Sequence, residues 1–246
     1  MDKGLYVAMT GASATLQAQA SVAQNLANVS TAGFKAHLVN IEAFVVPGAG
    51  LPTRVDAMLI SNGFNSDAGS VIQTGRPLDV TFGEDKWLAV QARDGGEAYT
   101  RNGALQVNAT GQLTTAGGNV VLGQGGPISI PPNEQVSIGA DGTISITPQG
   151  QGPETVAIIG RLRVVNAPSA SLTRRDDGLM GTRDRNVPVP AAGNVLASGA
   201  YEGSNVNTAD MLVQMIQMSR QFEMQVKILK AGDDNAQSAN SLLRLG

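Results

Sequence analysis

Small and hydrophobic side chains recur with a helical period at the N-terminal end of the chain. Over residues 3–28 the spacing alternates between four and three residues, which is typical of a helix that packs along a partner helix. This first stripe consists of Leu5, Met9, Ala12, Leu16, Gln19, Ala23 and Leu26. Gly33 follows it as a stop signal. The pattern predicts a helix about 39 Å long, given a rise of about 1.5 Å per residue.

The C-terminal end carries a second stripe of the same kind, over residues 208–243. Asn207 precedes it as an expected N-cap, and Asp210 falls in the first turn, where a negative charge is favourable. The stripe consists of Met211, Met215, Met218, Phe222, Gln225, Leu229, Gly232, Ala236, Ala239 and Leu243. The sequence therefore predicts two long helices, one at each end, that pair when the chain returns to its start.

Between the helices the period changes to two, which indicates strands. Expected strands cover 78–82, 86–92, 98–101, 135–139, 143–147 and 156–165, and Gly-rich and Asn-Gly or Asp-Gly turns separate several of them. We therefore expect an α+β protein with three regions. These are a coiled-coil-like stalk of paired terminal helices (1–34 with 206–246), a connector region (35–75 with 185–205) and a central antiparallel β-rich domain (76–184).

The first helix carries no charged residue between Gly4 and Phe34. A solvated helix normally places charges on its outer face, so this helix is expected to be buried on several sides. Burial within its own monomer is the alternative, but a two-helix stalk cannot cover a helix all round. We therefore predict a subunit interface formed by Leu5, Met9, Ala12, Leu16, Asn25, Leu26, Asn28, Met211, Met215, Met218, Phe222, Leu229, Gly232 and Leu243.

Gly232 falls inside the second stripe, between Leu229 and Ala236. Glycine in a helix interior costs about 1 kcal/mol relative to alanine unless a partner approaches closely there. Two interpretations remain open: a close contact with a helix of the same or a neighbouring copy, or a tolerated surface glycine.

Composition excludes several chemistries. The chain has no cysteine and one histidine, which argues against thiolate or multi-histidine metal sites, and its net charge of −3 gives no basic footprint for nucleic acid. Adjacent carboxylates occur at 84–85, 176–177 and 233–234, in expected turns or on a charged helix. We expect no catalytic site, no metal and no cofactor. We also expect neither a membrane-inserted segment nor a cleavable signal peptide.

Four motifs, in order, resemble those of the flagellar rod and hook protein family. They are residues 25–35 (NLANVSTAGFK), 74–80 (TGRPLDV), 99–105 (YTRNGAL) and 202–207 (EGSNVN). Chain length, residues 50–54 (GLPTR) and residues 234–240 (DNAQSAN) resemble a proximal-rod member more than the slightly longer distal-rod protein, which remains an alternative. One departure is residues 83–87 (GEDKW), where members often carry Gly-x-Gly before an aromatic residue.

The resemblance implies a non-enzymatic structural subunit of the bacterial flagellar basal body. Copies would self-assemble through their terminal helices into a drive shaft that spans the periplasm, beside other rod proteins, after passage through the flagellar type III export apparatus. The alternative from another class is a secreted β-domain protein that binds or hydrolyses carbohydrate. Such a protein needs stacking aromatics, and the chain has one Trp and three Tyr.

Overall fold

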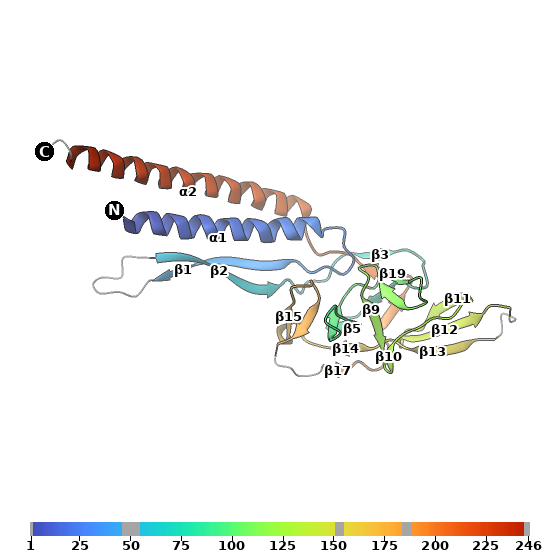
Figure 1. The fold of residues 1–246 in the computed structure, drawn as a ribbon. Coiled ribbons are helices and arrows are strands. Elements are labelled where there is room, and N and C mark those ends of the chain that lie inside the picture. The colour runs from blue at the N-terminus through green and yellow to red at the C-terminus, as the bar shows by residue number, and fades with distance from the viewer. Residues whose placement is uncertain (1, 46–54, 151–154, 184–187, 244–246) are drawn as a thin grey trace. The chain divides into compact units, whose positions relative to one another are not determined.

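The computed structural model describes residues 2–45, 55–150, 155–183 and 188–243 (Figure 1). The chain forms two compact units. The helical unit comprises residues 1–28, 37–63 and 206–246, and the β unit comprises residues 29–36 and 64–205. The predicted connector region is thus divided between them. Residues 50–54, used above as a sequence signature, lie outside the described residues.

Two helices form most of the helical unit. Helix α1 spans Asp2–Ala27 and helix α2 spans Thr208–Leu243, which agrees with the predicted helices to within one residue at each end. Asn207 caps α2 as predicted, because its Oδ1 accepts a hydrogen bond of 3.0 Å from the amide of Ala209. The helices run antiparallel, since Leu5 lies against Gly232 and Gly11 against Gln225. Neither described helix is apolar enough over the necessary length to cross a bilayer.

A two-stranded ribbon occupies part of the region predicted as connector. Strands β1 (His37–Val45) and β2 (Val55–Phe64) pair with each other, and α1 lies between this ribbon and α2 (Figure 1). Asn25 fastens the ribbon to α1 in both directions. Its Nδ2 donates to the carbonyl of His37 over 2.9 Å, and its Oδ1 accepts from the amide of His37 over 2.8 Å.

The β unit is built from short strands whose pairings are antiparallel. They are β3 (Val71–Gln73), β4 (Val80–Phe82), β5 (Lys86–Gln91), β6 (Glu97–Thr100), β7 (Leu105–Val107), β8 (Leu113–Thr115), β9 (Val120–Gly123), β10 (Gly126–Pro127), β11 (Asn133–Ile138), β12 (Thr143–Pro148), β13 (Ala157–Arg161), β14 (Val164–Asn166), β15 (Leu172–Arg174), β16 (Met180–Thr182), β17 (Val189–Pro190), β18 (Leu196–Ser198) and β19 (Ala200–Glu202). A short 3₁₀ helix spans Ser169–Ser171.

These strands form one large sheet and three small ones. The ten-stranded sheet runs β15-β16-β6-β5-β9-β8-β7, with β10, β14 and β17 attached, and β11-β12-β13 form a separate three-stranded sheet. The pairs β18-β4 and β19-β3 bring the end of the unit back to its start. The single strand predicted over 156–165 is wrong. It is broken at Leu162, because β13 pairs with β12 whereas β14 pairs with β5.

The main core of the β unit lies between these strands. Its largest fully buried side chains include Leu88, Leu105, Leu113, Val121 and Ile144. A second, smaller cluster surrounds Trp87. The two cores explain why the β unit is a compact body of its own.

Candidate functional site

The seam between α1 and α2 follows the stripe that the sequence predicted on α2. Every described side chain of that stripe is half-buried, while no described side chain of α2 is fully buried. The half-buried members are Met211, Met215, Met218, Phe222, Gln225, Leu229, Gly232 and Ala236. Leu243 belongs to α2, but its side chain lies outside the described residues.

Gly232 lies at the closest point of this seam. A Cβ atom built on Gly232 would lie 2.8 Å from Cδ2 of Leu5, a separation that real Cβ contacts essentially never show. The partner is therefore α1 of the same chain. Of the two interpretations of Gly232, the structure favours the close contact over the tolerated surface glycine.

On α1 the buried face differs from the predicted stripe. The residues buried on this helix are Ala12, Ala14, Thr15, Ala18, Ser21, Val22 and Asn25. Of the predicted stripe, Leu5 and Leu26 are half-buried, whereas Met9 is 53% and Leu16 48% exposed. Small side chains let neighbouring elements approach closely, so the Ala-rich face packs inside the chain and the larger side chains stay outside. The spacing alone could not tell these faces apart.

The two asparagines predicted at a subunit interface make contacts within their own chain. Asn25 is 3% exposed, and both ends of its amide bond the backbone of His37. Asn28 is half-buried, and its Nδ2 donates to the carbonyl of Gln24 over 2.8 Å. Asn25 therefore holds the start of the ribbon to α1, and Asn28 bonds the last turn of that helix.

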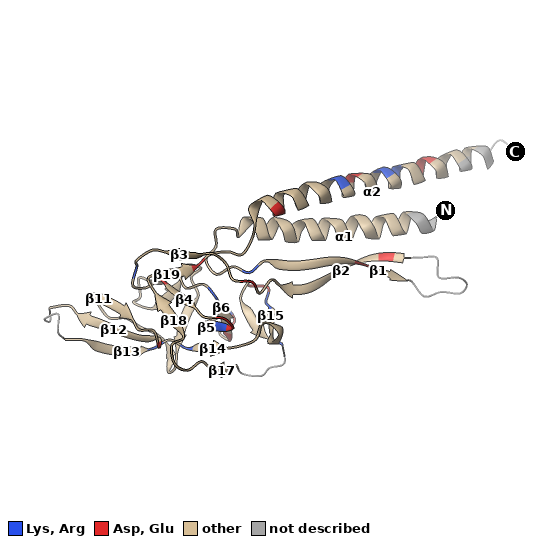
Figure 2. Ribbon diagram, turned by 180° about the vertical axis from the view of Figure 1, so that it is seen from behind, with Lys and Arg blue, Asp and Glu red and all other residues tan. Residues whose placement is uncertain are grey.

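The helical unit exposes an unusual number of large apolar side chains. Monomers rarely expose large contiguous apolar surface, and such surface often marks protein–protein contacts. The exposed side chains are Tyr6, Met9 and Leu16 on α1, Leu38, Ile41, Phe44, Val45, Val55 and Met58 on the ribbon, and Leu212, Val213, Ile216, Met224, Val226 and Ile228 on α2. Charges lie along α2, whereas α1 has none after its first residues (Figure 2).

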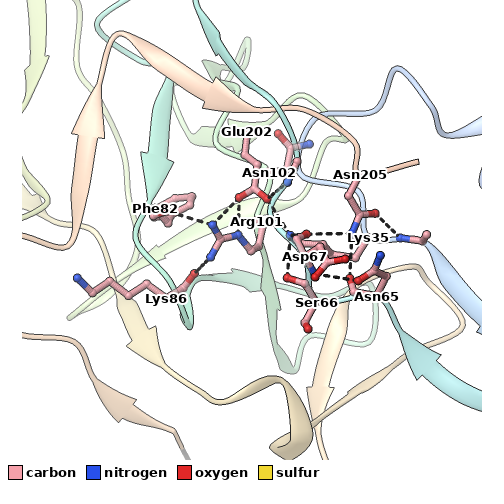
Figure 3. Close-up of polar contacts among 12 residues, drawn as sticks. Lys35, Asn65, Ser66, Asp67, Phe82, Lys86, Arg101, Asn102, Glu202 and Asn205 are labelled. Carbon is pink, nitrogen blue, oxygen red and sulfur yellow. Dashed lines mark hydrogen bonds and ion pairs between the residues drawn. The ribbon is translucent and has the colours of Figure 1, made fainter. Parts of the chain in front are cut away.

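The β unit contains a buried ion cluster formed by Lys35, Arg101 and Glu202, here called the clasp (Figure 3). Glu202 Oε1 accepts from Lys35 Nζ over 2.7 Å, and Oε2 accepts from Arg101 Nε over 2.6 Å. The side chains of Lys35 and Glu202 are each 2% exposed. Two cations thus share one carboxylate away from water.

Neighbouring carbonyl groups complete the clasp. The Arg101 guanidinium also donates to the carbonyls of Phe82, Gly83 and Lys86, and Lys35 Nζ donates to the carbonyl of Asp67 over 2.6 Å. Lys35 Nζ also donates to the carbonyl of Ser66, so every donor of these two side chains has a partner within the chain. Buried charges of this kind are stable only when they are paired and hydrogen-bonded.

The clasp perturbs the acid–base behaviour of its members. Burial raises the pKa of Glu202, but the hydrogen bond from Lys35, the charge of Arg101 and the amide of Gly69 outweigh it, so this pKa lies below its ordinary value. Burial lowers the pKa of Lys35 below its ordinary value, and the attraction of Glu202 only partly opposes that shift. A lowered pKa keeps the Glu202 carboxylate ionised at neutral pH.

Asn205 and Gly33 allow the backbone segments around the clasp to pack closely. Asn205 Oδ1 accepts from the amide of Ala36, and its Nδ2 donates to the carbonyls of Asn65 and Asp67 (Figure 3). Gly33 has φ +66°, and a Cβ there would lie 2.2 Å from the carbonyl carbon of Arg101. Only glycine fits this position.

Three of the four sequence motifs therefore meet at the clasp, since Lys35, Arg101 and Glu202 belong to residues 25–35, 99–105 and 202–207. The motifs were visible in the sequence, but their mutual contact was not. One signal was available: Lys35 ends a long uncharged stretch, and a lone charge after such a stretch invites a search for its partner.

The motifs also have counterparts in known proteins. Residues 5–35 match the model of the flagella basal body rod protein family, and residues 197–242 match the C-terminal model of flagellar basal body rod FlgEFG proteins. Residues 84–146 match the flagellar hook protein FlgE/F/G D1 domain. Flagellar basal-body rod protein FlgF of Escherichia coli K12 is 45% identical over the full length of both chains. The chain belongs to the flagellar basal-body rod protein family.

Other relatives refine the position within the rod protein family. FlgF of Salmonella typhimurium LT2 is 44% identical over the full length of both chains. FlgG of Buchnera aphidicola subsp. Schizaphis graminum is 31% identical over 98% of this chain and 100% of its own. The resemblance to FlgF is therefore stronger than that to this FlgG, as the length and terminal motifs predicted.

Membership settles the class of function. The protein is a structural rod subunit of the flagellar basal body and not an enzyme, and it associates with other rod or basal-body proteins. The carbohydrate-binding or hydrolytic alternative is set aside on this ground.

Proposed function

We propose that the helical unit is the assembly surface of this rod subunit. Copies of the chain and other proximal- and distal-rod proteins pack against α1, the ribbon and α2, and the helices form a coiled-coil-like stalk within the rod. The assembled rod spans the periplasm and transmits torque as a drive shaft. The predicted interface residues that remain exposed, Met9 and Leu16, lie on this surface.

The uncharged length of α1 is the observation that carries this proposal. Leu16 is 48% exposed on a helix with no charge from Gly4 to its end, and the surrounding polar side chains are small or neutral. Such a surface suits close packing with another protein better than contact with water.

We further propose that the chain reaches the rod through the flagellar type III export apparatus without loss of a cleavable leader. The family resemblance supports this route. N-terminal sequencing of the protein in purified basal bodies tests it: the residue after an intact or simply processed Met1 is expected, and loss of a longer segment contradicts the proposal.

The Leu16→Asp substitution tests the assembly surface. An unpaired carboxylate buried at a subunit contact costs several kcal/mol, whereas in the unassembled chain the exposed side chain stays in water. We expect loss of swimming and of rods in electron micrographs, with an unchanged circular dichroism spectrum of the purified chain.

Ile158→Asp is the matched control, because Ile158 is 73% exposed on the β unit. This variant is expected to swim. Normal rods with Leu16→Asp would contradict the proposal, and so would equal loss of rods in both variants.

A further inference from the structure

A groove opens in the helical unit between α1, the ribbon and α2. Its volume is about 410 Å³, and its walls are mainly apolar, with Val7 from α1, Ile41 and Val55 from the ribbon, and Ile228 from α2. A helix is about 10–12 Å wide with its side chains. The groove therefore has room for a row of side chains from a partner rather than for a whole helix.

Two carboxylates line this otherwise apolar groove. Glu42 on β1 and Asp56 on β2 both contribute to its wall. Among the described residues neither forms an ion pair. An apolar groove with two unpaired acids favours a ligand that combines apolar and basic side chains.

The outer side of α2 presents that combination. Val213, Ile216 and Met224 are 52%, 55% and 57% exposed, on the side of the helix opposite the seam with α1. Arg220 and Lys227 share this side and are exposed, and within the described part of the chain no acid pairs with either. The five residues, called here the outer stripe, recur at helical spacing.

Charge along this part of α2 is predominantly basic. Between residues 213 and 230 it carries Arg220, Lys227 and Lys230 against a single acid, Glu223. Helix α1 has no charge over the corresponding length, so it offers no partner for these bases. On the described surface of the helical unit, the carboxylates in the groove are suitable partners.

We propose that the outer stripe of α2 of one copy docks into the groove of a second copy. This inference rests on the proposed function and specifies the contact by which copies assemble. Met224 and its apolar neighbours enter the groove, and Arg220 and Lys227 pair with Glu42 and Asp56. Because stripe and groove lie on different sides of one unit, each copy offers both, so the contact repeats from copy to copy.

Engineered cysteines give a direct test, because the natural chain has none. One copy carries Asp56→Cys and a second copy carries Arg220→Cys, and the two are produced together in motile cells. Only a contact between copies can join them, since each has a single thiol. An Arg–Asp pair holds its Cα atoms further apart than the roughly 4.4–6.8 Å that a disulfide spans, so a short bismaleimide replaces direct oxidation. We expect a cross-linked dimer of the two variants when isolated basal bodies are treated with this reagent.

Gln221→Cys replaces Arg220→Cys in the matched control. Gln221 is the next residue and is also exposed, but it projects about 100° away around the helix. The Asp56→Cys and Arg220→Cys pair is expected to give a dimer band several times stronger than the control pair. Equal bands would overturn the inference.

Charge exchange separates this inference from the proposed function. Glu42→Lys with Asp56→Lys should abolish rods, and so should Arg220→Glu with Lys227→Glu, whereas the four changes together should restore them. If the combined variant fails and Leu16→Asp also prevents assembly, the docking inference is wrong while the proposed function stands. If Leu16→Asp assembles normally, the proposed function itself fails.

Discussion

Glu202 is the residue on which the β unit most depends electrostatically. Its carboxylate is the only acid of the clasp and balances Lys35 and Arg101. Removing it leaves two buried cations without a counter-charge. Removing Lys35 instead leaves Arg101 and Glu202 as an ion pair with no net charge. The carboxylate still accepts hydrogen bonds from Arg101 and from the amide of Gly69.

We therefore expect Glu202 substitutions to destabilise the fold more than Lys35 substitutions. Glu202→Gln should reduce the free energy of unfolding by about 3–5 kcal/mol, the usual cost of breaking a buried pair, and Lys35→Met should cost less. Urea unfolding followed by fluorescence measures both, because the only tryptophan, Trp87, lies 5.8 Å from the Arg101 guanidinium. A larger loss for Lys35→Met would refute the ranking.

The stability of the β unit should depend on pH through the Glu202 carboxylate. The folded-state pKa of Glu202 lies below its ordinary value of 4.5, so its contribution to stability is complete above pH 4.5 and is lost as pH falls through the folded pKa. The urea midpoint of the wild type should fall over this range. Glu202→Gln should show a smaller fall, and parallel curves for the two proteins would contradict the assignment.

Gly232 gives a prediction at the seam of the helices. The atom nearest to a Cβ on Gly232 is Cδ2, at the far end of the flexible Leu5 side chain. Gly232→Ala therefore needs only a small movement of Leu5, and the higher helix propensity of alanine stabilises α2 by about 1 kcal/mol. Gly232→Leu overpacks the seam, which typically costs about 1–3 kcal/mol. We expect motility with Ala and its loss with Leu. Ala231→Leu is the control, because Ala231 is the neighbouring residue and is exposed, and cells with this variant should remain motile. Motility of cells with Gly232→Leu would contradict the close-contact interpretation.

Among the elements, the helices were the easiest to predict and the ribbon the hardest. A stripe over ten helical turns specifies both the type and the bounds of α2, since chance rarely sustains such a period. Residues 37–45 (HLVNIEAFV) lack the strict alternation of a half-buried strand, because most side chains of β1 are exposed. Pro47 and Pro52 also favoured a connector.

Contacts between distant motifs were beyond what the sequence shows. Each motif was recognisable, but Lys35 and Glu202 are 167 positions apart, and no local period relates them. The face of α1 was similarly ambiguous, since Ala-rich and Leu-containing stripes share one period and differ only in side-chain size. Packing against the ribbon selected the Ala-rich face.

At the scale of the whole molecule, the two units differ in how they are held together. The β unit has two buried cores and the clasp, whereas α2 has no fully buried side chain among those described. Helices of this kind derive most of their stability from packing. The helical unit should therefore open more readily than the β unit before assembly.

Hydrogen exchange of the isolated full chain measures this difference. Amides of α2 should exchange orders of magnitude faster than those of β5, because local opening costs little where few contacts are buried. Residues 33–36 should be protected together with the β unit, although they lie shortly after α1 in the sequence, because the clasp and Asn205 hold them. Equal protection in α2 and β5, or rapid exchange at 33–36, would contradict this account.

The clasp also has a consequence for the order in which the chain folds. Lys35 becomes available early as a chain emerges from its N-terminal end, but its carboxylate partner follows 167 residues later. Closing so long a loop is entropically costly and kinetically late. A chain that has emerged only in part has two cations and no acid with which to bury them. Completion of the β unit therefore waits for nearly the whole polypeptide, and the incomplete chain remains open until Glu202 arrives.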